Sequence, residues 1–188
     1  LNTIAGWWQA TDGTPDYFHS CSDKAGVPNN VFGQQPAKDG EAYAGLVTFS
    51  VGNKRNYREY LQSKLTRPLM AGEMVCIEMS VNAADYCNYV TDGIGILLTE
   101  KKVESNVQTE LSYKATMSNP RCNMLDESNE WQLLSDVYTA KGGEEYITVG
   151  NFKADKELKV IRRTEDLSDK GYGTWSYMYI DDVKVRPV

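Results

Sequence analysis

Aromatic and polar side chains that suit sugar binding lie in two stretches of the sequence. Sugar rings present CH-rich faces that stack on aromatic rings, and their hydroxyl groups bind polar or charged side chains. On an extended segment two neighbours point to opposite sides, so either Trp7 or Trp8 is expected to face solvent. Arg58 and Tyr60 lie opposite Leu61 on a predicted strand and form a second candidate pair. The predicted sugar-binding residues are Trp7, Trp8, Tyr17, His19, Arg58 and Tyr60.

The residue types and motifs of the sequence give little indication of an enzyme. The chain has one histidine and 26 acidic residues. Glycosidases use two carboxyl groups about 5 to 9.5 Å apart, and among so many acids some pair will always meet that spacing. The sequence contains no GxSxG, HExxH or phosphate-binding loop. We therefore expect a protein that is not an enzyme, and keep a small polysaccharide-active enzyme as a third hypothesis.

The four cysteines allow three full pairings, and the sequence does not choose among them. They are Cys21, Cys76, Cys87 and Cys122. We expect two disulfides, or one disulfide and two buried thiols. No CxxC pair is present and the chain has one histidine, so a zinc site is not expected.

Charge and hydropathy exclude two classes of partner. The 188-residue chain carries a formal charge of −6, which disfavours binding to nucleic acid or to an anionic membrane. No apolar run approaches the length of a membrane span. The first residues lack the basic start and apolar stretch of a signal peptide, and the chain does not begin with Met, so we expect a processed product or part of a longer protein.

The elements that must position these residues are strands. Apolar residues alternate over 73–81, with Val75, Ile77, Met79 and Val81 on one face, and turn signals precede 145–152. Segment 57–66 also fits a helix by its four-residue apolar spacing, but its alternation favours a strand. The remaining expected strands are 43–50, 93–99, 109–116, 131–138, 158–163 and 175–185. About nine strands of this kind predict an all-β jelly-roll sandwich.

The first forty residues differ from the rest. They are rich in turn-forming residues and contain four aromatic residues, Trp7, Trp8, Tyr17 and Phe18. We expect a long structured loop packed on the sandwich, and one domain over residues 1–188.

Several segments together resemble one family. They are residues 14–21, 27–30, 33–35, 40–46, 57–61, 143–152 and 179–183. The chain resembles the jelly-roll domain of large surface proteins of the Bacteroidetes, including OmpA-type and gliding- or secretion-associated ones. That domain is similar to carbohydrate-binding modules of the galactose-binding-like superfamily. The resemblance implies an extracellular or cell-surface, outer-membrane-associated location.

The resemblance also implies a structural calcium ion at Asp181 and Asp182, near the end of the last strand. Calcium takes six to eight oxygen ligands. Adjacent strand residues point to opposite faces, so only one of the two is expected to bind the ion. Asp181 is favoured because it shares a face with Val183 and Val185, which predicts that it points into the core. The alternative is a carboxylate satisfied by backbone amides or an arginine.

The chain departs from the family in one respect. Members open with a strand that reads roughly Asn-Gly-Ser-Phe-Glu, and no such segment precedes Gly6 here. Either the chain was cut before this point or the strand is missing, and a missing strand would expose a sheet edge that could pair with a strand of a partner. The leading functional hypothesis, which rests on the resemblance, is a non-catalytic surface module that binds glycan. The alternative is a structural or adhesive module of a cell-envelope assembly that binds protein and no sugar.

Overall fold

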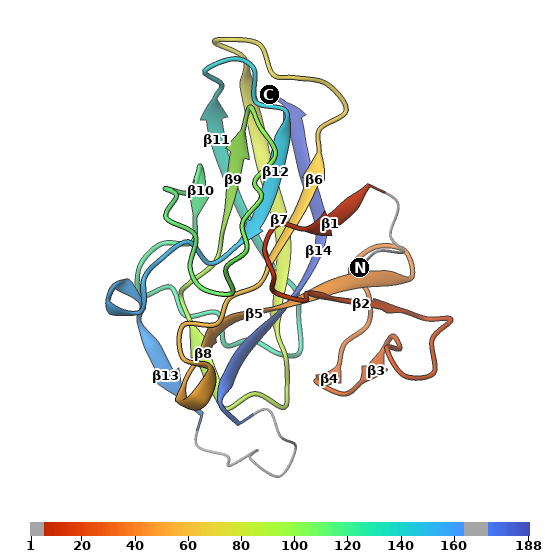
Figure 1. Cartoon of the computed structure of the whole chain (residues 1–188). Helices are drawn as coiled ribbons and strands as arrows, with labels where there is room; N and C mark the ends of the chain where they lie inside the picture. The colour runs from red at the N-terminus through yellow and green to blue at the C-terminus, as the bar shows by residue number, and fades with distance from the viewer. Residues whose placement is uncertain (1–5, 164–172) are drawn as a thin grey trace.

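The computed structural model describes residues 6–163 and 173–188 and consists of two five-stranded antiparallel sheets packed face to face (Figure 1). The first sheet has the order β1 (Trp7–Gln9), β6 (Tyr60–Lys64), β12 (Tyr146–Gly150), β9 (Gly95–Thr99) and β10 (Met117–Ser118). The second sheet has the order β11 (Gln132–Thr139), β7 (Met74–Ala83), β14 (Trp175–Pro187), β5 (Ala42–Ser50) and β2 (Asp16–His19). The prediction of an all-β jelly-roll sandwich is confirmed.

Small elements complete the described part of the chain. β8 (Tyr89–Thr91) pairs with β13 (Val160–Arg162), and β3 (Asn29–Asn30) pairs with β4 (Gly33–Gln34). Two 3-10 turns, η1 (Gly52–Lys54) and η2 (Asp155–Glu157), contribute one turn each. Within residues 6–163 and 173–188, no helix is long and apolar enough to cross a bilayer.

Most expected strands are present, and the main error lies at 109–116. The alternating segment 73–81 forms β7, and 57–66 contains a strand, β6, as favoured over a helix. Residues 109–116 form no strand, because this segment crosses the outer face of the first sheet and buries Leu111 there. Fourteen strands occur in the described residues instead of about nine. Strands of only two to four residues are too short to show an alternation of apolar and polar residues in the sequence.

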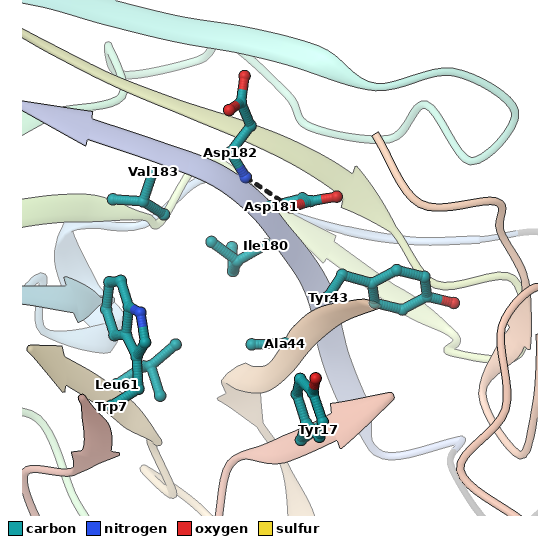
Figure 2. Close-up of a pocket in the computed structure, with 9 residues that line it drawn as sticks. All are labelled: Trp7, Tyr17, Tyr43, Ala44, Leu61, Ile180, Asp181, Asp182 and Val183. Atoms are coloured by element: carbon teal, nitrogen blue, oxygen red, sulfur yellow. Dashed lines mark hydrogen bonds between the residues drawn. The ribbon is translucent and has the colours of Figure 1, made fainter. Parts of the chain in front are cut away.

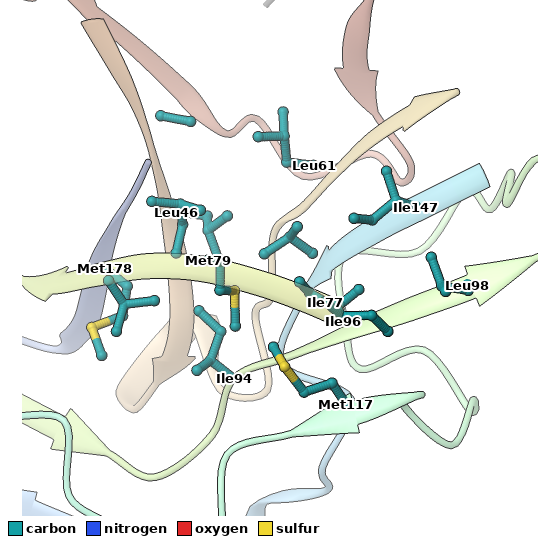
Figure 3. Packing of buried hydrophobic residues seen from close by; sticks show 14 of the residues in the cluster. Leu46, Leu61, Ile77, Met79, Ile94, Ile96, Leu98, Met117, Ile147 and Met178 are labelled. Atoms are coloured by element: carbon teal, nitrogen blue, oxygen red, sulfur yellow. The ribbon is translucent and has the colours of Figure 1, made fainter. Parts of the chain in front are cut away.

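The main core fills the space between the sheets (Figure 3). Alternation places Ile77, Met79 and Val81 of β7 on the inner face, all with no exposed surface. Ile96 of β9 and Val149 of β12 meet them from the first sheet and are equally buried. The alternating pattern of 73–81 therefore predicted its buried face correctly.

The N-terminal segment packs on the outer face of the second sheet. Phe18 and Phe32 are buried against Tyr43, Tyr177 and Tyr179, and the rings of Phe32 and Tyr177 stack with centroids 3.9 Å apart. Each of these rings removes a large apolar area from water. This second cluster explains why β14 is aromatic on one face and aliphatic on the other.

A long connection covers the outer face of the first sheet. Residues 100–116 join β9 to β10, and Val103 and Leu111 from this connection pack on Tyr60 and Leu97. The side-chain amide of Gln62 donates to the Val103 carbonyl at 2.9 Å and accepts from the Val103 N–H at 2.8 Å. Tyr60 donates to the Asn151 carbonyl at 2.6 Å. This face of the sheet is therefore closed by the chain itself.

Two features of β14 shape the surface nearby. The strand pairs with β5 over residues 175–180 and with β7 over residues 178–181, but over residues 184–187 it pairs with β7 alone. The register shifts between Asp181 and Lys184, where Asp182 and Val183 of β14 lie opposite Met79 alone on β7, and Asp182 has φ +52°. The bulge and the unpaired side of β14 leave the sandwich open beside β1.

All four cysteines lie in the described residues and are free thiols. The expectation of disulfides was wrong, because each thiol lies in a different part of the fold. Cys87 is buried in the aromatic cluster, whereas Cys21 and Cys122 are exposed. Burial raises the pKa of the Cys87 thiol to about 12, which keeps it protonated.

Candidate functional site

A groove of about 230 Å³ opens between the two sheets beside the bulge of β14 (Figure 2). It is bounded by the edge strand β1 and by β6 on one side, and by β2, β5 and β14 on the other. Its lining residues are Trp7, Tyr17, Tyr43, Ala44, Leu61, Ile180, Asp181, Asp182 and Val183. Four of the eight residues predicted as sugar or metal ligands thus meet in one place.

Trp7 forms one wall of the groove. β1 pairs with β6 in the register Trp7 to Ser63, so the indole turns toward the opening between the sheets and packs partly on the core. Trp8 takes the opposite side of β1, where its ring lies 6.5 Å from Tyr146 and 5.3 Å from the ammonium of Lys102. The expectation that the two neighbours face opposite sides is confirmed. Both rings are half-buried, so each keeps an exposed surface.

Tyr17 faces Trp7 across the groove (Figure 2). It pairs with Ala44 on β5, which places its half-buried ring on the inner side of β2, while Phe18 turns outward into the aromatic cluster. The ring of His19 lies 6.0 Å from that of Tyr17, but His19 does not line the groove.

Asp181 is oriented differently from the prediction. The bulge breaks the alternation, so Asp181 does not share a face with Val183 and Val185, which pack on the core. One oxygen of the Asp181 carboxylate, Oδ2, accepts from the N–H of Lys38 at 2.8 Å and of Asp39 at 3.2 Å. The other, Oδ1, accepts from the Asp182 N–H at 2.7 Å. Burial raises the pKa of Asp181, and these amide donors oppose the shift.

These contacts do not fit a calcium ion held by both aspartates. Asp181 is satisfied by backbone amides, which is the alternative that the sequence left open. The carboxylate of Asp182 pairs with the ammonium of Lys184 at 2.6 Å, which leaves a positive charge where a cation would bind. The calcium ion stays a prediction and takes no part in the function proposed below.

Arg58 and Tyr60 are not sugar-binding residues in this structure, because both side chains have no exposed surface. Arg58 forms an ion pair with Asp155 and donates to the Tyr57 carbonyl at 3.0 Å. Tyr60 lies on the outer face of the first sheet, as its alternation predicts, but residues 100–116 cover it. Alternation indicates the face of a strand and does not reveal what lies on that face.

The groove continues along β14. A second hollow of about 320 Å³ shares Trp7 and Val183 with the first and runs past Leu65, Val185 and Pro187. At its far end Arg67 donates to Glu73 at 2.9 Å, and this contact lowers the pKa of Glu73 to about 2. The two hollows together form an extended groove with aromatic, apolar and charged sections.

The arrangement suits a ligand with flat apolar faces and many hydroxyl groups. Trp7 and Tyr17 offer ring surfaces, and the carboxylates of Asp181 and Asp182 can accept hydrogen bonds from sugar hydroxyl groups at the rim. The other lining residues were not predicted as site residues; they are Tyr43, Ala44, Leu61, Ile180 and Val183. Their apolar character fits core positions equally well, so no signal in the sequence marks them.

Neither a protein-family profile nor a curated protein matches the chain. Solved structures match it at low identity. The CBM22-2 xylan-binding domain of Paenibacillus barcinonensis Xyn10C has a TM-score of 0.53 and 11% identity, covering 99% of this chain and 94% of that chain. The CBM22-1 and GH10 modules of Clostridium thermocellum endo-1,4-beta-D-xylanase 10B, complexed with xylohexaose, have a TM-score of 0.52 and 11% identity, covering 97% of this chain and 26% of that chain. At these identities the likeness establishes a sandwich like that of carbohydrate-binding modules.

Proposed function

We propose that this protein is a non-catalytic, extracellular module that binds a polysaccharide in the groove between its sheets. One observation carries the proposal: Trp7 and Tyr17, both half-exposed, line one groove that has two carboxylates at its rim. Apolar ring surfaces with a few placed polar groups are the composition typical of sugar sites. The resemblance to Bacteroidetes surface proteins supports the extracellular location.

The shape of the groove favours an extended chain over a single sugar. Both hollows follow β14 from Asp181 to Pro187, and Trp7 lies where they join. A linear polysaccharide would place one sugar between Trp7 and Tyr17 and the next units along Val183 and Val185. Xylan is the first polymer to test, because the structural neighbours named above bind xylan or were solved with xylohexaose.

Affinity gel electrophoresis tests the proposal. The wild-type protein is run in native gels that contain xylan, soluble cellulose derivatives, mannans, β-glucans or pectins, each with calcium and with a chelator. We expect retardation by at least one polymer class, unchanged by the chelator because the groove itself requires no metal. The absence of retardation by all five classes would contradict the proposal.

A second candidate function rests on the unpaired side of β14. Residues 184–187 pair with β7 alone, and the adjacent hollow exposes Leu65, Val183 and Val185 of the sandwich interior. An open edge of this kind can accept a strand from another chain. This observation favours an assembly module. It predicts concentration-dependent self-association in analytical ultracentrifugation that Val185→Lys suppresses, together with no retardation by any polysaccharide.

A further inference from the structure

His19, Cys21 and Glu41 form a cluster outside the groove that the proposed function does not use. One nitrogen of the imidazole, the thiol sulfur and one carboxylate oxygen lie within 4.8 Å of one another. Among residues 6–163 and 173–188 this is the one group of three such ligands that meets this spacing. His19 is half-buried, and Cys21 and Glu41 are exposed, so solvent reaches the cluster.

Strand pairing brings the three residues together. β2 and β5 end their ladder with His19 opposite Ala42, and the Ser20 N–H extends it by donating to the Glu41 carbonyl at 3.0 Å. The chain then turns, and the Cys21 N–H donates to Nδ1 of His19 at 3.0 Å. The turn therefore directs the thiol back toward the imidazole, while Glu41 enters from the neighbouring strand.

We propose that His19, Cys21 and Glu41 bind a divalent zinc-like transition metal ion. An imidazole nitrogen, a thiolate and a carboxylate oxygen are all zinc ligands, and three protein ligands leave a fourth position for water. Zinc bonds of about 2.0–2.3 Å place ligand atoms about 3.3–3.7 Å apart in a tetrahedral site. Small rotations of the exposed Cys21 and Glu41 side chains would bring the ligand atoms to this spacing.

Metal binding changes the protons and hydrogen bonds of the cluster in a defined way. The thiol of Cys21 loses its proton to solvent and binds as thiolate. Nδ1 of His19 holds a lone pair that accepts the Cys21 N–H in the metal-free chain. If Nδ1 binds the metal ion, the metal bond replaces this hydrogen bond, and Nε2 keeps the ring proton.

The sequence did not predict this site. A zinc site was not expected because the chain has one histidine and no CxxC pair. Two of the ligands are two residues apart, but Glu41 lies twenty residues beyond Cys21 and reaches them only through the pairing of β2 with β5. The three ligand atoms are therefore close together only in the folded chain.

Cobalt(II) titration of the reduced, metal-free protein tests the proposal. Cobalt takes zinc sites and gives a near-ultraviolet charge-transfer band when a thiolate binds it. We expect this band to appear at one equivalent of cobalt and to disappear when zinc is added. Cys21→Ser should abolish the band, and His19→Ala and Glu41→Gln should each weaken cobalt binding about tenfold or more.

Cys122→Ser is the matched control, because Cys122 is the other exposed thiol and belongs to no such cluster. The control should keep the full band, and circular dichroism should show that every metal-free variant is folded like the wild type. A band that survives in Cys21→Ser, or that is lost in Cys122→Ser, would overturn the proposal, as would the absence of any band in the wild type. None of these variants changes a groove residue, so polysaccharide binding is measured independently.

Discussion

Glu59 is buried and Asp16 is half-buried, and both carboxyl groups have a raised pKa. Glu59 accepts from the Val47 N–H and from the Tyr57 hydroxyl, both at 2.7 Å. Asp16 accepts from the Tyr177 hydroxyl at 2.6 Å. Burial raises the pKa of both groups above their ordinary values of 4.5 and 3.8, and the charge of Asp16 adds to the shift at Glu59.

The raised pKa values predict how stability depends on pH. As pH rises above about 4, the unfolded chain releases these protons while the folded chain still holds them, so the free energy of unfolding falls. The fall ends once the pH passes the folded-state pKa values. Glu59→Gln should remove part of this fall, because glutamine does not titrate. Urea unfolding at a series of pH values measures the free energy of unfolding of the wild type and of Glu59→Gln.

Glu104→Gln is the control for that series, since Glu104 is exposed and its carboxylate pairs with Lys102 at 2.7 Å. The control should follow the wild-type curve. If Glu59→Gln also follows the wild-type curve through the whole acidic range, burial does not raise the pKa of Glu59 as we infer.

The sequence predicted the direction of a side chain well where that direction depends only on the extended geometry of the strand. Trp7 and Trp8 face opposite sides because β1 is extended, and that followed from their adjacency. Arg58 and Tyr60 were misassigned because their burial depends on segments far away in sequence, namely Asp155 and residues 100–116. Exposure of a side chain is a property of the tertiary structure, and strand alternation does not contain it.

At the scale of elements, the connection over residues 100–116 decides which face of the first sheet is accessible. Gln62 holds it by two hydrogen bonds to Val103, and both are buried. Gln62→Ala leaves the Val103 amide and carbonyl without these partners, which costs about 1–3 kcal/mol. We therefore expect local opening, and cleavage by trypsin after Lys101 and Lys102 about tenfold faster than in the wild type.

Gln108→Ala is the matched comparison. Gln108 lies on the same connection, is exposed, and donates from its side chain to the Asp12 carbonyl at 3.1 Å. Its loss should change the cleavage rate little, because water replaces the partner of an exposed group. Equal cleavage rates in the two variants would show that Gln62 does not hold the connection in place.

The bulge in β14 is the element that sequence reasoning missed at the site. Asp182 adopts φ +52°, a region that aspartate enters more readily than most residues. Asp181 follows Ile180 onto the side away from the core, where it meets the amides of Lys38 and Asp39, and the extra residue returns Val183 and Val185 to the core side. The adjacent Asp181 and Asp182 predict a metal site by resemblance, yet the same two residues also mark an irregular strand.

At the scale of the whole molecule, the sandwich class followed from the density of alternating apolar segments. The two-sided burial of β14 did not, because it requires the first forty residues to pack on the outer face of the second sheet. The groove exists where β5 leaves β14 and β1 covers only part of the opening. Such a gap depends on the residues at which strands end, and strand ends are the part of a fold that sequence patterns predict least well.

The most direct test of the groove as a glycan site compares the two neighbouring tryptophans. Trp7→Ala and Trp8→Ala are run side by side in affinity gels that contain the polymer that retards the wild type, after circular dichroism has shown both to be folded. The groove predicts that Trp7→Ala loses about tenfold or more in affinity, about 1.4 kcal/mol, whereas Trp8→Ala binds like the wild type. Unchanged retardation of Trp7→Ala would contradict the groove as the sugar site, and a loss confined to Trp8→Ala would place the site beside Trp8, on the opposite side of β1.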